Sequence, residues 1–498
     1  MGSYVRNKVA LINPRKGWRP ALGLLYIASY LRKAQYDVRI FEFIDEQFDR
    51  KCNDNIWKTL FSFQPDFVGF GVISWNRAVC RLQIAKIRVQ LPDSIIICGG
   101  KDPSYVVDKY FSFGADIVVI GEAEETMVEL LDALKSSKSF NDSPLEDIKG
   151  ISYIRNGRSI TNPTREPMSL KNLLFPAFDL VNYAHYTDIR LGGIPGHFIK
   201  TGYMMANRGC PYNCKFCAEK VRNIYREREI DDIISEIRWQ QDRWDIDGMV
   251  FLDDLFYFNE NRMRSFCDRI LEEKIDLKLY AQMRVDRCPS DETLRLMRKA
   301  GFIQLAMGIE SGSPRLLEHI NKGITPDMCR NTVARINMAG IYTYCFLIIG
   351  LPGERVEDLE MTVELIRELK PTFVAVNYYM PMPGTKFFTE EDDEIIGTLS
   401  YSLTENQVFR SEIDQRTLST YRNKFESLAQ RNANYNLLYY PDFLWFIIKT
   451  CLFKPHCIFK GILVQIREKR YPNMFDAVKT AIINQRIIGN LSEKKKIS

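Results

Sequence analysis

Three closely spaced cysteines are the residues in this sequence best suited to carry out chemistry. Cys210, Cys214 and Cys217 stand at C-x3-C-x2-C in the segment NRGCPYNCKFCAEK, directly after a predicted strand. Thiolates are the ligands that iron–sulfur clusters prefer, and three of them on one loop can bind three corners of a cubane. A structural zinc site would need a fourth Cys or His nearby, but the next cysteine, Cys267, falls in a helical pattern. The spacing predicts an iron–sulfur cluster with one iron left open for chemistry.

The cysteine loop and several later segments resemble the radical S-adenosylmethionine (radical SAM) superfamily. The signature of that family has this spacing with an aromatic residue before the last cysteine, here Phe216. The later segments follow in the family's order: YREREIDDIISEI, FLDDLF, GIES, IIGLPGE and PMPGT. The resemblance covers about residues 195–390. It implies a 4Fe-4S cluster whose open iron is chelated by S-adenosylmethionine (SAM), which the reduced cluster cleaves to a 5′-deoxyadenosyl radical.

The resemblance also implies which residues contact SAM. Phe216 would pack near the adenine, and Glu310 and Ser311 would lie beside the ribose or the methionine. Gly350–Pro352 would form a backbone edge that reads the base. Each of these positions also has an ordinary structural interpretation as part of a loop or a helix cap.

Two charged positions at strand ends complete the expected SAM site. Asp253, followed by Asp254, ends a predicted strand at the same mouth and is placed near the methionine ammonium group. Arg284 ends the next strand and could pair with the methionine carboxylate, because a guanidinium binds carboxylates through two hydrogen bonds.

The first part of the chain resembles the cobalamin-binding domain that precedes the radical SAM core in one large subclass. The segments RPALGLLYIASYLRK, PDFVGFGVIS, IIICGG and DIVVIGEAEE occur in that subclass in this order, and the resemblance covers about residues 7–137. Ligands of parallel sheets lie beyond the carboxyl ends of the strands. The residues expected there to contact cobalamin are Ser74, Trp75, Gly99, Gly100, Gly121 and Glu122.

This first domain contains no histidine, although many cobalamin proteins supply one to the cobalt. The four histidines are His185, His197, His319 and His456. The tail base of a bound cobalamin is therefore expected in the crevice of the sheet, with Ser74, Trp75 or water beneath the cobalt. Lys101 stands where the usual sequence has a proline after the glycine pair.

The elements that position these residues follow from the hydrophobic pattern. Short apolar runs alternate with helix-length stretches in the first third, which predicts a doubly wound, flavodoxin-like parallel sheet. Six further strand–helix units follow; spacing leaves a partial barrel or a second wound sheet open, and the resemblance favours a partial (β/α)6 barrel. The expected units are a cobalamin-binding-like domain at 1–137, a connector with an Asn156-Gly157 hairpin at 138–200, a radical SAM core at 201–390, and a mainly helical, basic and aromatic region at 391–498.

The composition is typical of a globular protein: of the 498 residues, 46% are hydrophobic and 26% are charged. The net charge of +5 does not indicate a nucleic-acid partner. The last region is basic and aromatic. Residues 431–498 carry twelve Lys and Arg against four Asp and Glu, and they include the aromatic stretch Leu437–Ile448. That combination fits a membrane-surface helix or an apolar cap over the barrel. Scattered single cysteines and the lack of a signal-peptide core favour a cytoplasmic location. The membrane-surface interpretation of the last region would make the protein membrane-peripheral.

The two resemblances together imply a cobalamin-dependent radical SAM methyltransferase acting on an unactivated carbon of a small-molecule or lipid substrate. A flavodoxin or ferredoxin would serve as electron donor. A radical SAM enzyme that closes rings or rearranges carbon skeletons is the first alternative. A non-enzymatic cobalamin or redox sensor is the second, but it would not need the GIES and IIGLPGE segments.

Overall fold

The computed structural model describes residues 6–44, 50–137, 140–187, 200–218, 224–256, 259–398 and 410–437. The aromatic and basic segment after residue 437 lies outside the described residues, so its membrane-surface or cap role stays a prediction. Within the described part of the chain, no helix is both long and apolar enough to cross a membrane.

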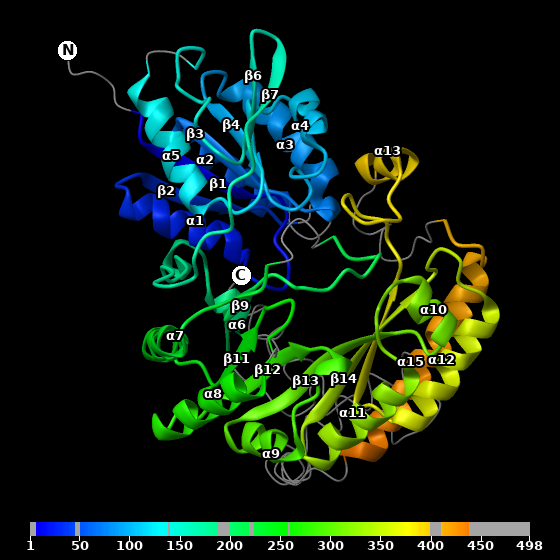
Figure 1. The fold of residues 1–498 in the computed structure, drawn as a ribbon. Helices are drawn as coiled ribbons and strands as arrows, with labels where there is room; N and C mark the ends of the chain where they lie inside the picture. Colours follow the sequence, from blue (N-terminus) through cyan, green and yellow to red (C-terminus); the bar gives the residue numbers. More distant parts are fainter. Residues whose placement is uncertain are drawn as a thin grey trace.

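The first domain is a parallel sheet covered by helices on both faces, as predicted (Figure 1). Its parallel strands are β1 (Lys8–Asn13), β2 (Asp37–Glu42), β3 (Phe67–Gly71), β4 (Ile95–Gly99) and β5 (Ile117–Val119), in the order β2-β1-β3-β4-β5. One core cluster contains residues of α1 (Leu22–Lys33) and α5 (Glu124–Ser136). Another contains residues of α2 (Arg50–Phe63), α3 (Arg77–Gln90) and α4 (Val107–Phe113). Strands β1, β3, β4 and β5 are apolar on both faces because both faces are buried, whereas the edge strand β2 carries the exposed Asp37 and Arg39.

The predicted hairpin forms and extends this sheet. Strands β6 (Ile151–Arg155) and β7 (Arg158–Thr161) are antiparallel, and β6 pairs with β5. Asn156 and Gly157 have φ of 52° and 73°, the two left-handed positions of a tight hairpin turn. The sequence predicts the hairpin within the connector at 138–200, whereas in the structure it forms the outer edge of the first sheet.

The second domain is a sheet of six parallel strands in the order β15-β14-β13-β12-β11-β8. The strands are β8 (Thr201–Met204), β11 (Gly248–Phe251), β12 (Lys278–Met283), β13 (Phe302–Glu310), β14 (Tyr342–Ile349) and β15 (Phe373–Tyr378). The helices on its outer face are α7 (Ile230–Trp244), α8 (Glu260–Glu272), α9 (Asp291–Lys299), α10 (Pro314–His319), α11 (Pro326–Met338), α12 (Val356–Leu369) and α15 (Gln415–Leu437). This is the partial barrel that the sequence predicts.

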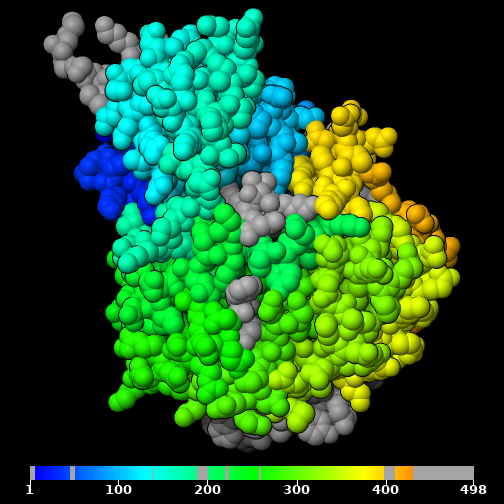
Figure 2. Space-filling model, in the orientation of Figure 1, coloured from blue at the N-terminus to red at the C-terminus, as the bar shows by residue number. Residues whose placement is uncertain are grey.

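The two domains are packed together (Figure 2). The carboxyl ends of strands from both sheets meet at the junction, where they line one cavity. Residues of α1 and of the connector, among them Tyr26 and Tyr186, belong to one core cluster with the inner face of the second sheet. Helix α13 (Glu390–Thr398) returns to the first domain and contacts α3, as Figure 2 shows in yellow against blue. There Asp393 forms an ion pair with the fully buried Arg77.

Candidate active site

A cavity of about 430 Å³ lies where the strand ends of the two domains meet. It opens to solvent, and the unfilled space including its mouth is about 1490 Å³. Five of the residues predicted from the sequence line it: Gly99, Gly100, Gly121, Glu122 and Asp253. Residues from both domains form the wall, because parallel strands of each sheet end at this junction.

Ser74 and Trp75 are not part of the cavity lining, in contrast to the sequence expectation. Both residues lie in the short 3-10 helix η1 (Ser74–Asn76). The Ser74 hydroxyl donates to Asp102 at 2.5 Å, and Trp75 packs beside Met380 in a small cluster. Ile73, one residue earlier, lines the cavity in their place.

Close backbone approach explains the glycines in the wall of the first domain. Gly100 has φ of 113°, and a Cβ there would lie 2.3 Å from the carbonyl oxygen of Val72. A Cβ at Gly69 would lie 2.9 Å from a methyl group of Leu11. At Gly99 the nearest atom to an added Cβ is 3.6 Å away, in ordinary contact. Gly100 is therefore required by the backbone, whereas Gly99 is free to carry a side chain.

The three cysteines lie together on the loop that follows the two-residue strand β9 (Asn207–Arg208). Cys214 is buried, Cys210 and Cys217 are half-buried, and all three are free thiols. Burial raises the pKa of Cys217 to about 12, with the charge of Asp254 acting in the same direction. Burial also raises the pKa of Cys210. A negative charge on Cys214 would raise the pKa of both thiols further.

Three cysteine thiols are suitable ligands for a 4Fe-4S cubane, although their sulfur atoms do not converge on a common metal position. Among the described residues, no three His, Cys, Asp or Glu side chains are close enough to hold a metal ion as they stand. Metal binding deprotonates such thiols and frequently orders the segment that carries them. Arg284 donates toward the sulfur of Cys214 at 3.7 Å, so a cation is already placed against one thiol.

Arg284 differs from the sequence expectation, because its guanidinium is already engaged. It is buried, pairs with Asp286 at 2.8 Å, and donates to the carbonyl of Lys322 at 2.6 Å. Its guanidinium also lies 3.6 Å from the ring centre of Tyr212. In the structure Arg284 therefore holds the cysteine loop against the strand ends.

Lys322 connects three predicted site residues, and no motif in the sequence pointed to it. It is buried and pairs with Glu310 at 2.7 Å. Its ammonium group lies 5.7 Å from the ring centre of Phe216, and its carbonyl accepts from Arg284. Glu310 has φ of 64° at a register shift of β13, a strained conformation typical of functional sites.

Ser311 and Gly350 are held by neighbours on α12 and the loop before it. The Ser311 hydroxyl lies 3.2 Å from that of Thr362. The Gly350 N–H donates to the Glu354 carboxyl at 2.5 Å, which fixes the turn through the half-buried Pro352. Burial raises the pKa of Glu354 to about 8, because desolvation disfavours its charged form.

The raised pKa of Glu354 makes stability fall with rising pH. Its pKa of about 8 in the folded protein lies above its ordinary value of 4.5, so between these two pH values the folded protein binds more protons than the unfolded chain. Ionised Glu354 therefore lowers the free energy of unfolding at high pH by a few kcal/mol, at about 1.4 kcal/mol per pKa unit. We expect Glu354→Gln, which mimics the neutral form, to remove this loss. Melting temperatures at pH 6 and pH 9 should show the variant gaining on the wild type at the higher pH. An unchanged difference between the two pH values would contradict this.

Asp253 positions the start of the cysteine loop. Its carboxylate accepts from the backbone N–H of Ala206 at 3.2 Å and from that of Asn207. Burial raises the pKa of Asp253 to about 7, and these two donors oppose that rise. Both oxygens are thus engaged by the chain, so the expected contact with the methionine ammonium has no support from this geometry.

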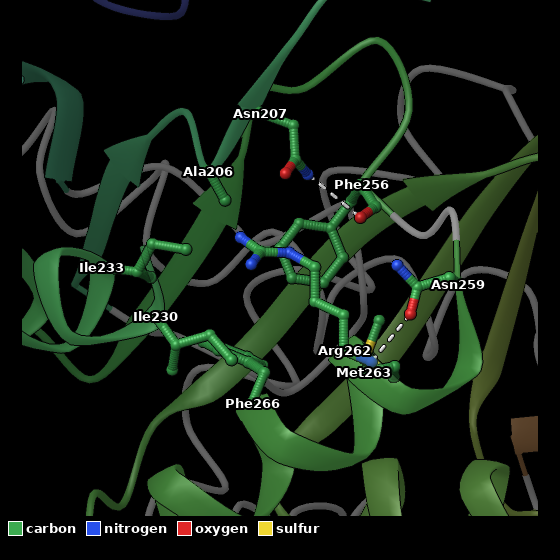
Figure 3. Close-up of a pocket in the computed structure, with 9 residues that line it drawn as sticks. All are labelled: Ala206, Asn207, Ile230, Ile233, Phe256, Asn259, Arg262, Met263 and Phe266. Carbon is green, nitrogen blue, oxygen red and sulfur yellow. Dashed lines mark hydrogen bonds between the residues drawn. The ribbon is translucent and has the colours of Figure 1, made fainter. Parts of the chain in front are cut away.

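A second, much smaller hollow lies behind Asn207, between α7 and α8 (Figure 3). Its volume is about 20 Å³, enough for a single water. The Asn207 amide donates to the carbonyl of Phe256 at 3.1 Å, and Asn259 caps the helix that carries Arg262. This hollow belongs to the packing that supports the cysteine loop and is too small for a cofactor.

Comparison with known proteins places the chain in a family. Residues 204–366 match the radical SAM superfamily, and residues 9–131 match the B12 binding domain. An uncharacterized methyltransferase of Pyrococcus horikoshii is 30% identical over 375 residues, which cover 74% of this chain and 78% of the relative. An anaerobic magnesium-protoporphyrin IX monomethyl ester cyclase of Rubrivivax gelatinosus is 26% identical, over 83% of this chain and 74% of the relative.

A solved structure shows the same fold. TsrM from Kitasatospora setae, a radical SAM methyltransferase with cobalamin and a 4Fe-4S cluster bound, matches with a TM-score of 0.62 at 18% identity. The match covers 79% of this chain and 79% of the TsrM chain. The chain belongs to the radical SAM superfamily, as a member that carries a B12 binding domain before the radical SAM core.

Proposed function

We propose that this protein is a cobalamin-dependent radical SAM methyltransferase with a small-molecule substrate. The observation that carries the proposal is the cavity between the domains. One wall is the glycine-lined crevice of the first sheet, and the other includes Arg208 and Gly209 at the start of the cysteine loop. A cofactor in this cavity would face the cluster loop directly, as transfer between the two centres requires.

The crevice of the first domain fits a corrinoid. The lining includes the glycines Gly69, Gly71, Gly99 and Gly100, and apolar side chains, among them Leu11, Ile97, Val119 and Met127. A large flat ring can approach such backbone closely. None of the described residues that line the cavity is a histidine, so none of them would supply an imidazole to the cobalt.

The SAM site would be built from the residues that Lys322 and Glu354 hold in place. Glu310 and Ser311 stand at the end of β13, and Gly350–Pro352 stand at the end of β14. Phe216 would supply an apolar surface for the adenine beside them. When bound at Cys210, Cys214 and Cys217, a 4Fe-4S cluster supplies the electron that cleaves SAM, and cobalamin supplies the methyl group.

A ring-closing radical enzyme is the second candidate, because a cyclase is among the relatives at 26% identity. The remaining partners are proposals from the sequence: a flavodoxin or ferredoxin as electron donor, a cytoplasmic location, and membrane contact through the segment after residue 437 if the substrate is a lipid. No described feature indicates a nucleic-acid partner.

The test is anaerobic reconstitution with iron and sulfide, followed by reduction with SAM in the presence and absence of cobalamin. The proposal predicts 5′-deoxyadenosine, and in addition S-adenosylhomocysteine that forms only when cobalamin is present, because the methyl group leaves SAM by that route. Production of 5′-deoxyadenosine alone in both samples would favour the cyclase. Without either product the radical SAM assignment of the site would be wrong.

A further inference from the structure

Four buried charges connect the wall of the cavity to the base of the cysteine loop. They form a chain in the order Arg226, Glu122, Arg208 and Glu124. Arg226 holds both oxygens of Glu122, at 2.6 and 3.0 Å. Arg208 lies 3.5 Å from Glu122 and donates to Glu124 at 2.6 Å. All four side chains are at most 14% exposed, and two positive charges balance two negative ones.

The two arginines belong to the ribbon that encloses the cysteines. Arg208 is the last residue of β9, and Arg226 is the first of β10 (Arg226–Glu227), which pairs with β9 in antiparallel register. Cys210, Cys214 and Cys217 lie between these two strands in the sequence. Any shift of the ribbon therefore displaces both ends of the segment that carries them.

The two glutamates belong to the cobalamin-domain side of the cavity. Glu122 lies in the turn after β5, and Glu124 is the first residue of α5. All four charged residues line the cavity together with Gly99, Gly100 and Gly121. Met168 of the connector fastens the junction further: its N–H donates to Glu122 at 3.0 Å and its carbonyl accepts from Arg226 at 2.6 Å.

We infer that Arg208 and Arg226 are positioning residues that couple the two cofactor sites, so that corrinoid binding and SAM binding strengthen each other. The inference rests on the proposed function. A corrinoid that fills the cavity orders the turn at Gly121–Glu124, and the ion pairs transmit that order to the ribbon. Because coupling between sites is reciprocal, SAM bound at the loop tightens corrinoid binding by the same factor.

The buried ion pairs suit this role better than exposed ones. Their geometry is fixed, since a bidentate arginine–carboxylate pair specifies both distance and orientation. An exposed pair is screened by water and restrains its partners weakly. The same loop also contacts the first domain through the Tyr105 hydroxyl, which donates to the carbonyl of Ala218.

The test measures the dissociation constant of hydroxocobalamin for the full-length, cluster-reconstituted protein, with and without saturating SAM. In the wild type we expect SAM to tighten corrinoid binding at least about fivefold, the lower end of typical coupling. The double variant Glu122→Gln/Arg226→Gln removes both charges of this ion pair, so neither residue is left as an unpaired buried charge. In this variant the ratio of the dissociation constants without and with SAM should fall to within about twofold of one. The ratio is the readout, because a merely structural role would lower the melting temperature and leave the ratio unchanged.

Arg330→Gln/Glu368→Gln is the matched control. That ion pair is also 2.6 Å long but lies exposed on the outer helices, so the ratio should equal that of the wild type. Should the first double variant fail to fold, Glu124→Gln/Arg208→Gln breaks the other end of the chain of charges and should give the same loss. A wild-type ratio of one, or an unchanged ratio in a folded variant, would overturn the inference. If the wild type binds no corrinoid at all, the proposed function itself is wrong.

Discussion

Replacing any one of Cys210, Cys214 and Cys217 with alanine is expected to abolish SAM cleavage. Three thiolates are the fewest protein ligands that hold a cubane and leave one iron open, so the loss of one removes the cluster. Losing an outer-shell partner of a metal typically costs about 10–100-fold in affinity or activity, and losing a ligand exceeds that. The measurements are iron content, the visible absorption of the reconstituted cluster, and 5′-deoxyadenosine formed per protein under reducing conditions.

Cys267→Ala is the control for this prediction. Cys267 is fully buried within α8 and belongs to the core of the second domain. Its replacement should cost on the order of 1 kcal/mol of stability and leave cleavage unchanged. Substantial 5′-deoxyadenosine production by Cys214→Ala would refute the assignment of the cluster to this loop.

Gly99→Leu is expected to abolish corrinoid retention while the protein stays folded. Gly99 stands at the carboxyl end of β4 in the cavity wall and has no positive φ. Its Cβ would meet only Val119, at 3.6 Å, so the backbone accepts a side chain, which then occupies space that the corrinoid needs. Gel filtration after incubation with hydroxocobalamin, followed by an absorption spectrum of the protein peak, measures retention.

The control for the cavity prediction is Gly17→Leu. An added Cβ at Gly17 has no atom within 4 Å, and Gly17 is exposed and absent from the cavity lining. That variant should retain corrinoid as the wild type does, and both variants should keep the wild-type melting temperature within a few degrees. Corrinoid retained by a folded Gly99→Leu protein would place the binding site elsewhere.

The elements of the fold were predictable because their patterns are local. The hairpin of β6 and β7 was predictable from Asn156-Gly157, since few residues tolerate two successive left-handed positions. Helix α7 begins and ends where the amphipathic pattern of Ile230–Trp244 does. The pairing of that hairpin with β5 was not predictable, because the paired residues are distant in sequence. The hydrophobic pattern of the hairpin fits a separate connector as well as an edge of the first sheet.

Candidate site residues were predictable where a motif names them, but their contacts were not. Arg284 was predicted to pair with the methionine carboxylate because it stands at a strand end. In the structure its guanidinium pairs with Asp286 and donates to the carbonyl of Lys322. Ser74 and Trp75 were expected beneath the cobalt from the same rule. Both lie in the short turn η1, where Ser74 donates to Asp102 and Trp75 packs beside Met380, and no pattern in the sequence indicates that turn.

The sequence by itself determined the chemistry of the donor set, the family and the order of the two domains, because thiolate spacing, glycine positions and hydrophobic period are properties of short segments. Only the tertiary structure decided that Lys322 joins Phe216, Glu310 and Arg284, and that Arg208 and Arg226 meet Glu122 and Glu124 across the junction. The physical reason is that a buried charge is stable only beside an opposite charge or donor, and packing of the two sheets selects that partner from anywhere in the chain.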